Sequence, residues 1–229
     1  NIAALPTSLN GLTDGLVESN SLYIGNNPSS TSDNASYNVA VGTTALDAIT
    51  TGDNNSALGY DALTANTSGY ENTASGVESL YNNTSGRSNT AMGYRSLRAN
   101  TTGGYNTASG VESMYSNTTG QFNSAFGLKS LRKNTTASYN TALGYAAGYD
   151  ITTGEKNTII GYQADVSSSS TNQIVIGYQA DGQGDNYAVI GNSDITRLYA
   201  AEDAGATVYA AGLNLGGIAV TSTAAELNY

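Results

Sequence analysis

The sequence predicts an all-β protein, a parallel β-solenoid built from 17-residue coils. A glycine recurs at this interval along most of the chain, with an asparagine four residues before it and a small apolar residue two residues before it. A unit of this length cannot bury its apolar side alone, but it can stack on copies of itself at a spacing of about 4.8 Å. The repeat glycines are Gly42, Gly59, Gly76, Gly93, Gly110, Gly127, Gly144 and Gly161.

The charged residues favour the 17-residue coil over one of twice that length. The segment Asn-Thr-Ala-Ser-Gly-Val-Glu-Ser occurs at 72–79 and again at 106–113, so a coil of double length also fits the repeat. Two residues after successive glycines stand Glu78, Arg95 and Glu112. The shorter coil places opposite charges next to one another, whereas the longer one stacks glutamate on glutamate, which is destabilising.

The repeat divides the chain into three expected segments. Residues 1–21 are expected to be an N-terminal connector, residues 22–191 the β-solenoid, and residues 192–229 a β-rich junction to further sequence. The glycine interval shortens at its last two steps, from Gly161 to Gly177 and from Gly177 to Gly191, and the repeat ends there.

The composition argues against several classes of function. The chain has no histidine and no cysteine, which removes Ser-His and Cys-His nucleophiles and the usual zinc sites. A formal net charge of −10 with eight scattered basic residues argues against nucleic-acid binding, and no apolar run is long enough for membrane insertion. Asp61 and Glu78 are expected on an outer face with no inserted loop, so we expect no enzyme, no cofactor and no bound metal.

The residue just before each glycine is apolar in most coils and is expected to point outward, because side chains alternate along a strand. Leu58, Met92 and Phe126 occupy this position, with Ser75 and Ser109 between them. Each coil contributes only a thin apolar interior. An outward apolar column therefore predicts lateral association with further chains, usually with closed cyclic symmetry.

The candidate receptor-binding surface is a column of aromatic and basic residues that stand five positions after successive glycines. It consists of Tyr81, Arg98, Tyr115, Arg132 and Tyr149. Aromatic rings with interleaved cations are able to stack on the sugar rings of a cell-surface glycan. The same residues fit a structural cation–π ladder, in which each contact contributes about 0.5–1 kcal/mol. We favour the ladder and keep the glycan contact as the functional alternative.

Two further columns also have a structural and a functional interpretation. Asn-Thr-Ser and Asn-Thr-Thr tripeptides match the glycosylation pattern, although a hydrogen-bonded ladder of turn asparagines is strongly favoured. The threonines that follow are expected to form a flat hydroxyl array, for which ice binding is the less favoured alternative. The asparagines are Asn66, Asn83, Asn100, Asn117 and Asn134, and the threonines are Thr67, Thr84, Thr101, Thr118 and Thr135.

The repeat resembles the head repeats of trimeric autotransporter adhesins. The segments Asn-Ser-Ala-Leu-Gly-Tyr at 55–60, Asn-Thr-Ala-Leu-Gly-Tyr at 140–145 and Asn-Thr-Ile-Ile-Gly-Tyr at 157–162 carry this resemblance. It implies a left-handed parallel β-roll that forms a homotrimer. The flanking segments at 9–14, 191–199 and 220–229 are similar to sequences in bacteriophage tail fibres.

Together these resemblances imply a non-enzymatic trimeric segment of a viral or phage tail fibre. Such a segment serves in host-cell attachment, as a rigid shaft or as a receptor-binding head, on the virion or another extracellular surface. Its expected partners are two further copies of itself and a host cell-surface glycan or protein receptor. A bacterial surface adhesin and a purely structural spacer filament remain as alternatives.

Overall fold

The structure of the protein is a computed structural model, and it describes residues 15–25 and 34–195. The described residues contain twelve strands and no helix, so they include no helical segment long and apolar enough to cross a membrane. The expected junction at 192–229 lies almost wholly outside the described residues, as does most of the expected connector at 1–21.

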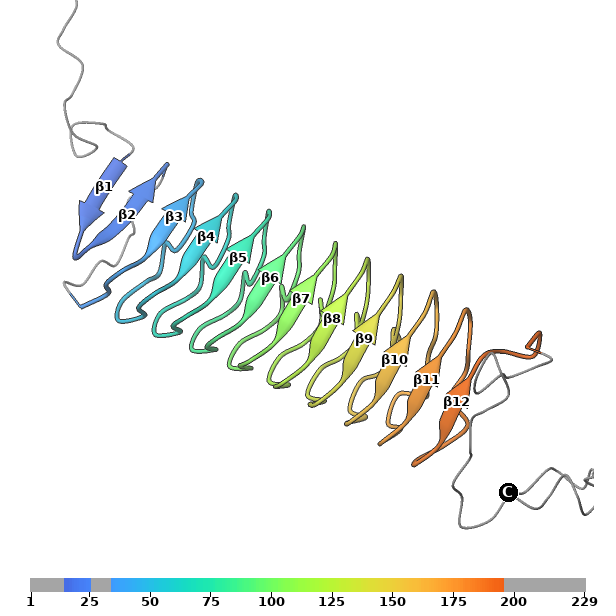
Figure 1. The fold of residues 1–229 in the computed structure, drawn as a ribbon. Helices are drawn as coiled ribbons and strands as arrows, with labels where there is room; N and C mark the ends of the chain where they lie inside the picture. Colours follow the sequence, from blue (N-terminus) through green and yellow to red (C-terminus); the bar gives the residue numbers. More distant parts are fainter. Residues whose placement is uncertain (1–14, 26–33, 196–229) are drawn as a thin grey trace, which may run out of the picture. The chain divides into compact units, whose positions relative to one another are not determined.

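The strands form a single sheet whose order follows the sequence, one strand per coil (Figure 1). β1 and β2 pair antiparallel, and each later strand pairs parallel with the one before it. The strands are β1 Gly15–Glu18, β2 Ser21–Ile24, β3 Val39–Val41, β4 Ser56–Leu58, β5 Thr73–Ser75, β6 Thr90–Met92, β7 Thr107–Ser109, β8 Ser124–Phe126, β9 Thr141–Leu143, β10 Thr158–Ile160, β11 Ile174–Ile176 and β12 Ala188–Ile190.

The register confirms the 17-residue coil. Ala74 in β5 pairs with Ala91 in β6, and the same offset holds from β2 to β10. As the charge pattern predicted, Arg95 Nε lies 3.0 Å from Glu78 Oε2 on the neighbouring coil. The offset falls to 16 residues between β10 and β11 and to 14 residues between β11 and β12, where the glycine interval shortens.

Hydrogen bonds between coils continue outside the three-residue strands. In the turn after β5, the Glu78 N–H donates to the Tyr60 carbonyl at 2.9 Å and the Leu80 N–H donates to the Ser96 carbonyl at 3.0 Å. Glu78 and Leu80 have left-handed φ values of 55° and 51°, a conformation that costs a non-glycine residue about 1–3 kcal/mol. Bonds to the coils on both sides hold the turn in this shape.

The repeat glycines allow the coils to approach closely. Gly76 has φ 137°, and a Cβ at this position would lie 2.6 Å from the Gly93 carbonyl oxygen of the next coil. Any other side chain would therefore force the two coils apart, since the obstructing atom belongs to the backbone. The fixed glycine in each coil thus follows from the spacing of the stack.

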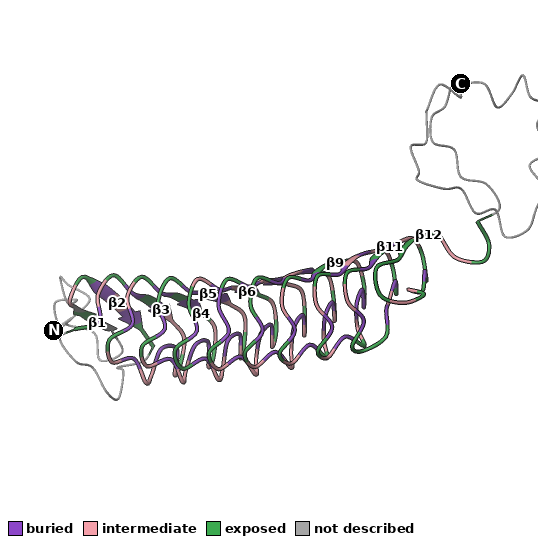
Figure 2. Ribbon diagram, turned by 90° about the horizontal axis from the view of Figure 1, so that it is seen from below, coloured by how far each residue is buried: buried purple, intermediate pink, exposed green. Residues whose placement is uncertain are grey.

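Buried residues recur in every coil along the stack (Figure 2), and they are only partly apolar. Each coil from β3 to β10 buries one alanine or isoleucine from its strand, such as Ala91, and most of them one leucine or methionine from the following turn, such as Leu97. Two columns of asparagine, with 0–1% exposure, fill much of the remaining interior. One column stands four residues before the glycines and contains Asn38, Asn55, Asn72, Asn89, Asn106, Asn123, Asn140 and Asn157.

These asparagines form a hydrogen-bonded ladder along the stack. The Oδ1 atom of Asn89 accepts bonds from both the backbone N–H and the Nδ2 of Asn106, at 3.0 and 3.1 Å. Asn106 Nδ2 also donates to the Gly120 carbonyl at 2.8 Å, and Asn106 Oδ1 accepts the same pair of bonds from Asn123. Because each carboxamide is satisfied by its counterparts, polar groups take the place of a larger apolar core.

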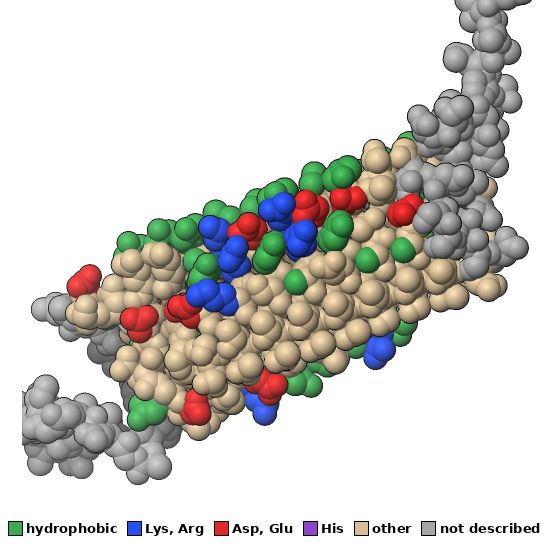
Figure 3. Space-filling view, turned by 180° about the vertical axis from the view of Figure 1, so that it is seen from behind, with side chains coloured by type: hydrophobic (Ala, Val, Ile, Leu, Met, Phe, Trp, Pro, Cys, Tyr) green, Lys and Arg blue, Asp and Glu red, His purple; other side chains and the backbone are tan. Residues whose placement is uncertain are grey.

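The outer surface carries an apolar ridge and a separate band of charge. The ridge consists of the residues on either side of the repeat glycines; Leu58, Met92, Phe126 and Leu143 are 42–56% exposed on one side of it. Figure 3, a view from behind, shows acidic and basic side chains gathered along part of one face, beside a broad face of uncharged polar residues. The expectation of an outward apolar column is therefore confirmed.

The asparagine ladder generates a prediction about stability. Asn106→Ala removes the acceptor of the Asn123 N–H and of one Asn123 Nδ2 hydrogen, and it removes the donor to the Gly120 carbonyl. We therefore expect the free energy of unfolding to fall by roughly 2–5 kcal/mol. Thr107→Ala, at the partly exposed first residue of β7, is the matched control and should change it by less than about 1 kcal/mol. Chemical denaturation measures both. An Asn106→Ala variant as stable as the control would show that the ladder contributes little.

Candidate binding surface

The five residues of the candidate receptor-binding column lie on top of one another and form a cation–π ladder. The Arg98 guanidinium carbon lies 5.0 Å from the ring centroid of Tyr81 and 5.8 Å from that of Tyr115. Arg132 lies in the same way between Tyr115 and Tyr149, at 5.2 and 5.9 Å. The structure thus brings all five together, in the arrangement that the structural interpretation predicted.

Carboxylates on the neighbouring column hold the arginines of this ladder in place. Glu78 accepts hydrogen bonds from Arg95 and Arg98, with 2.5 Å between Arg98 Nε and Glu78 Oε2. Glu112 accepts a bond from Arg132 Nε at 2.9 Å. The bonds from Arg95 and Arg98 lower the pKa of Glu78. Much of the hydrogen-bonding capacity and the ring faces of the ladder are therefore used inside the protein.

Sequence reasoning did not single out two further aromatic stacks. Phe122 stacks between Tyr105 and Tyr139, with ring centroids 4.9 and 5.2 Å apart and planes within 4° of parallel. Arg87 extends this stack, lying 5.3 Å from the Tyr105 ring and 6.0 Å from the Tyr70 ring. The sequence does carry a signal for Tyr105, Phe122 and Tyr139, since each stands five residues before one of three successive repeat glycines.

The second stack contains Tyr145, Tyr162 and Tyr178, each directly after a glycine. Their ring centroids are 5.0 and 5.3 Å apart. In both stacks the rings lie nearly parallel, so each ring covers the face of its neighbour and presents its edge outward. A sugar packs on the face of an aromatic ring, which leaves only the ends of such columns open to that contact.

The asparagines of the glycosylation pattern are buried in the second interior column. Asn83 Nδ2 donates to Asn66 Oδ1 at 2.8 Å, and the same bond joins the following members up to Asn134. All five have 0% exposure, so the folded chain does not present them to a glycosylating enzyme. The predicted asparagine ladder is confirmed, and Asn134 Oδ1 has no hydrogen-bond partner because Ile151 takes the next position.

The threonine column donates its hydroxyl hydrogens into the stack. Thr67 Oγ1 donates to the Thr84 carbonyl at 3.1 Å, and each later threonine of the column does the same to the next coil, at 2.9–3.1 Å. These bonds give the array a structural role. Its hydroxyl hydrogens are committed to the protein rather than to water.

The two carboxylates considered for catalysis are also engaged by neighbours. Asp61 Oδ1 accepts a hydrogen bond from the Thr44 hydroxyl, and Glu78 is paired with two arginines. Within residues 15–25 and 34–195, no group of three or more acidic side chains is arranged to hold a metal ion.

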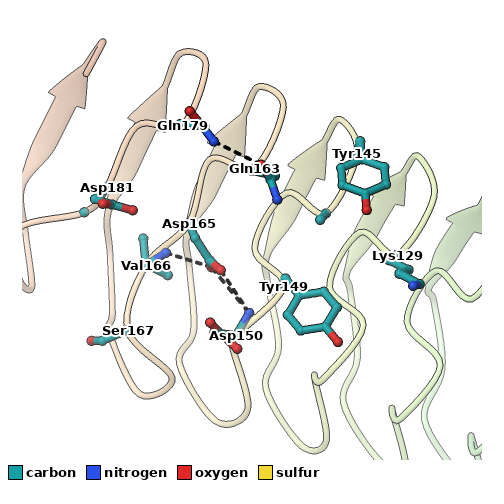
Figure 4. A pocket seen from close by; sticks show the side chains of 12 residues that line it. Lys129, Tyr145, Tyr149, Asp150, Gln163, Asp165, Val166, Ser167, Gln179 and Asp181 are labelled. Atoms are coloured by element: carbon teal, nitrogen blue, oxygen red, sulfur yellow. Dashed lines mark hydrogen bonds between the residues drawn. The ribbon is translucent and has the colours of Figure 1, made fainter. Parts of the chain in front are cut away.

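A cleft of about 800 Å³ lies where the 17-residue coils give way to shorter ones (Figure 4). We call it the step cleft. Residues of four successive coils line it, among them Lys129, Tyr149, Asp150, Gln163, Asp165, Gln179 and Asp181. Figure 4 shows Tyr145 and Tyr149 at one side and Asp181 at the other, with the carboxylates of Asp150 and Asp165 between them.

The step arises because the coil after Gly161 lacks one turn residue. In the preceding coil the Lys133 N–H donates to the Tyr149 carbonyl at 3.3 Å. The equivalent Asp150 N–H has no such carbonyl in the next coil and instead donates to the carboxylate of Asp165, at 3.2 Å to Oδ2. The Asp165 side chain thus replaces the missing backbone acceptor, and the surface recedes beside it.

The carboxyl of Asp165 has an unusual pKa. The pKa is raised to about 6, chiefly by burial and in part by the nearby carboxylates of Asp150 and Asp181, while the bonds from the Val166 and Asp150 N–H groups act to lower it. Burial favours the neutral form because a charged carboxylate loses its hydration. No sequence pattern announced this residue, since its role depends on the position of the lost turn residue.

Comparisons with protein-family models, with curated proteins and with solved structures found no match to this chain.

Asp165 generates a pH prediction. Its folded pKa is raised, so the neutral carboxyl stabilises the fold below about pH 4, and this contribution is lost as the pH rises through 6. We expect Asp165→Asn to be more stable than the wild type at pH 7, by about 1–3 kcal/mol, and of similar stability near pH 4.5. Denaturation of both proteins across this range measures the difference.

The contribution of Glu78 to stability changes with pH in the opposite direction to that of Asp165. Its pKa is lowered, so its contribution is present at neutral pH and lost only on acidification below its ordinary value of 4.5. Between pH 5 and pH 7 it stays ionised and should not obscure Asp165. A stability difference between wild type and Asp165→Asn that does not change with pH would contradict the assignment.

Proposed function

We propose that this chain is a non-enzymatic segment of a trimeric fibre that attaches a virus or phage to its host cell, as a rigid shaft or a receptor-binding head. The observation that carries the proposal is the parallel pairing that runs without a break from β2 to β12. A stack of this kind has the regularity of a fibre and, from β3 to β10, no inserted loop on which an enzyme site would be built.

The apolar ridge supports self-association. Leu58, Met92 and Phe126 project from the strand face with roughly half of their surface exposed, and the ridge continues along the whole stack. A shallow apolar hollow of about 300 Å³ lies beside Leu58, around Ser75. Contiguous apolar surface of this kind marks association sites, and identical chains most often close such contacts with cyclic symmetry.

Attachment through such a fibre depends on rigidity and multivalency. Three parallel copies present three identical surfaces at fixed positions, and several fibres on one particle multiply them. Linked weak contacts then bind far more tightly than one contact alone, by about 10²–10⁴-fold. The fold supports this use without any catalytic group.

A purely structural spacer is the second candidate. It is favoured by the Tyr–Arg ladder, whose rings and guanidinium groups bind one another and leave little for a ligand. Spacer and attachment head share the trimeric fibre and differ only in whether cells are bound.

The trimer is tested by mass in native solution. Sedimentation equilibrium should give three times the chain mass of 23.4 kDa, and Met92→Glu should yield a folded monomer because it places a charge in the apolar contact. Ser85→Glu, exposed away from the ridge, is the control and should remain trimeric. A monomeric wild type in dilute solution is the result that rejects the trimer.

Attachment is tested on cells with the same proteins. Fluorescently labelled wild-type chain should bind cells of its host from a panel of bacterial and animal cells. The Met92→Glu monomer should bind at least about tenfold less, because avidity is lost. A trimer that binds no cells in the panel would favour the spacer.

A further inference from the structure

The step cleft differs from the rest of the surface in placing the ring at one end of an aromatic column beside a hollow. Along the ladder, arginines lie over both faces of Tyr115. Arg132 and Lys133, which contact the Tyr149 ring at 5.9 and 4.8 Å, both come from the preceding coil. The next coil is the shortened one, and Tyr149 lines the cleft that the shortening opens.

Polar groups suited to sugar hydroxyls line the same cleft as this ring. Gln179 Nε2 donates to Gln163 Oε1 at 3.1 Å, which leaves Gln163 Nε2 as a donor and Gln179 Oε1 as an acceptor. Figure 4 shows both amides on the strand side of the cleft and the carboxylate of Asp181 beyond them. Carboxylates and amides at neighbouring positions match vicinal hydroxyl groups, which donate and accept at once.

A buried amide without partners lies behind the cleft wall. Gln173 is 1% exposed, and neither its Oε1 nor its Nε2 has a hydrogen-bond partner. Its carboxamide lies beside Gly182, which lines the cleft, and a Cβ at position 182 would lie 2.1 Å from Gln173 Oε1. Buried polar groups of this kind are usually satisfied by a partner, so this wall has unused hydrogen-bonding capacity.

The charge and size of the cleft restrict its ligand. Asp150, Asp165 and Asp181 line it together with Lys129, and Lys133 forms an ion pair with Asp150 at 2.6 Å, so the carboxylates outnumber the ammonium groups. This excess of carboxylates disfavours sialylated or phosphorylated sugars. A volume of about 800 Å³ lies within the range of small-molecule sites and accommodates more than one sugar ring.

We propose that the step cleft binds a neutral hexopyranose at the end of a cell-surface glycan, with the sugar lying on the face of Tyr149 and its hydroxyls bonded to Asp181 and Gln163. The inference rests on the proposed attachment function and places its receptor contact in the cleft rather than along the ladder. Of the candidate column Tyr81, Arg98, Tyr115, Arg132 and Tyr149, only Tyr149 then contacts the sugar.

Ligand-observed NMR on the full chain tests this proposal. The probes are the methyl glycosides of glucose, galactose and mannose and N-acetylglucosamine, with sialyllactose, glucose 6-phosphate and glucosamine as charged comparisons. We expect at least one neutral sugar to bind and the two anionic sugars not to bind. Tyr149→Ser and Asp181→Asn should each weaken binding at least about tenfold.

Tyr81→Ser is the matched control, because Tyr81 occupies the same position of its coil but lies outside the cleft. It should bind the neutral sugar as the wild type does. Circular dichroism establishes that each variant is folded, and Asp181→Asn, an exposed and nearly isosteric change, keeps the test valid if Tyr149→Ser does not fold.

Three results would overturn the proposal: no neutral sugar binds, only glucosamine binds, or Tyr81→Ser weakens binding as much as Tyr149→Ser. The trimer and cell-binding measurements are independent of these results. A trimer that attaches to cells without any sugar in the cleft therefore rejects this inference and leaves the fibre function in place.

Discussion

The fold of this protein depends on the contact between equivalent residues of neighbouring coils. Each asparagine from Asn38 to Asn157 accepts a hydrogen bond from the backbone N–H of the next coil, and most also accept one from the Nδ2 of the next asparagine. These bonds require a coil spacing of about 4.8 Å, and at that spacing only glycine fits at positions such as Gly76. The thin apolar interior is sufficient because the carboxamides and backbone bonds between coils supply much of the order.

Much of the fold could be predicted from the sequence because the stacking contact repeats in it. The glycine interval indicates the coil length, and the alternation of Glu78 with Arg95 selects this coil over one of double length. The left-handed turn residues could not be predicted. Glu78 and Leu80 are not residue types that favour this conformation, and only the bonds to the coils on either side impose it.

The candidate site was harder to predict than the fold. The Tyr–Arg column was visible as a spacing, and its ladder geometry agrees with the structural interpretation. The shortened glycine interval was visible too, but an interval does not reveal which turn residue is lost. Because the missing residue lies in the turn after Gly161, the Asp165 side chain replaces a backbone carbonyl and a cleft opens beside Tyr149. A break in a repeat therefore carries functional information that the repeat itself does not.

Regular columns and their interruptions have different capacities for binding. Within a column, rings and charges contact their own counterparts, so the groups that form the surface also stabilise the stack. Where the repeat changes length, these groups lose a neighbour on one side and become available to a ligand. The apolar ridge is the exception, since its side chains project outward along the whole stack and need a second chain to cover them.

Distances between spin labels test the stacking directly, and the absence of cysteine from the chain allows clean labelling. Labels at the exposed positions Thr51, Thr102 and Thr153 are separated by three and six coils. Labelled chain diluted into unlabelled chain should give about 14 Å for Thr51–Thr102 and about 29 Å for Thr51–Thr153. A Thr51–Thr153 distance no longer than the Thr51–Thr102 distance, or distances that do not grow in proportion to the number of coils, would contradict the stack.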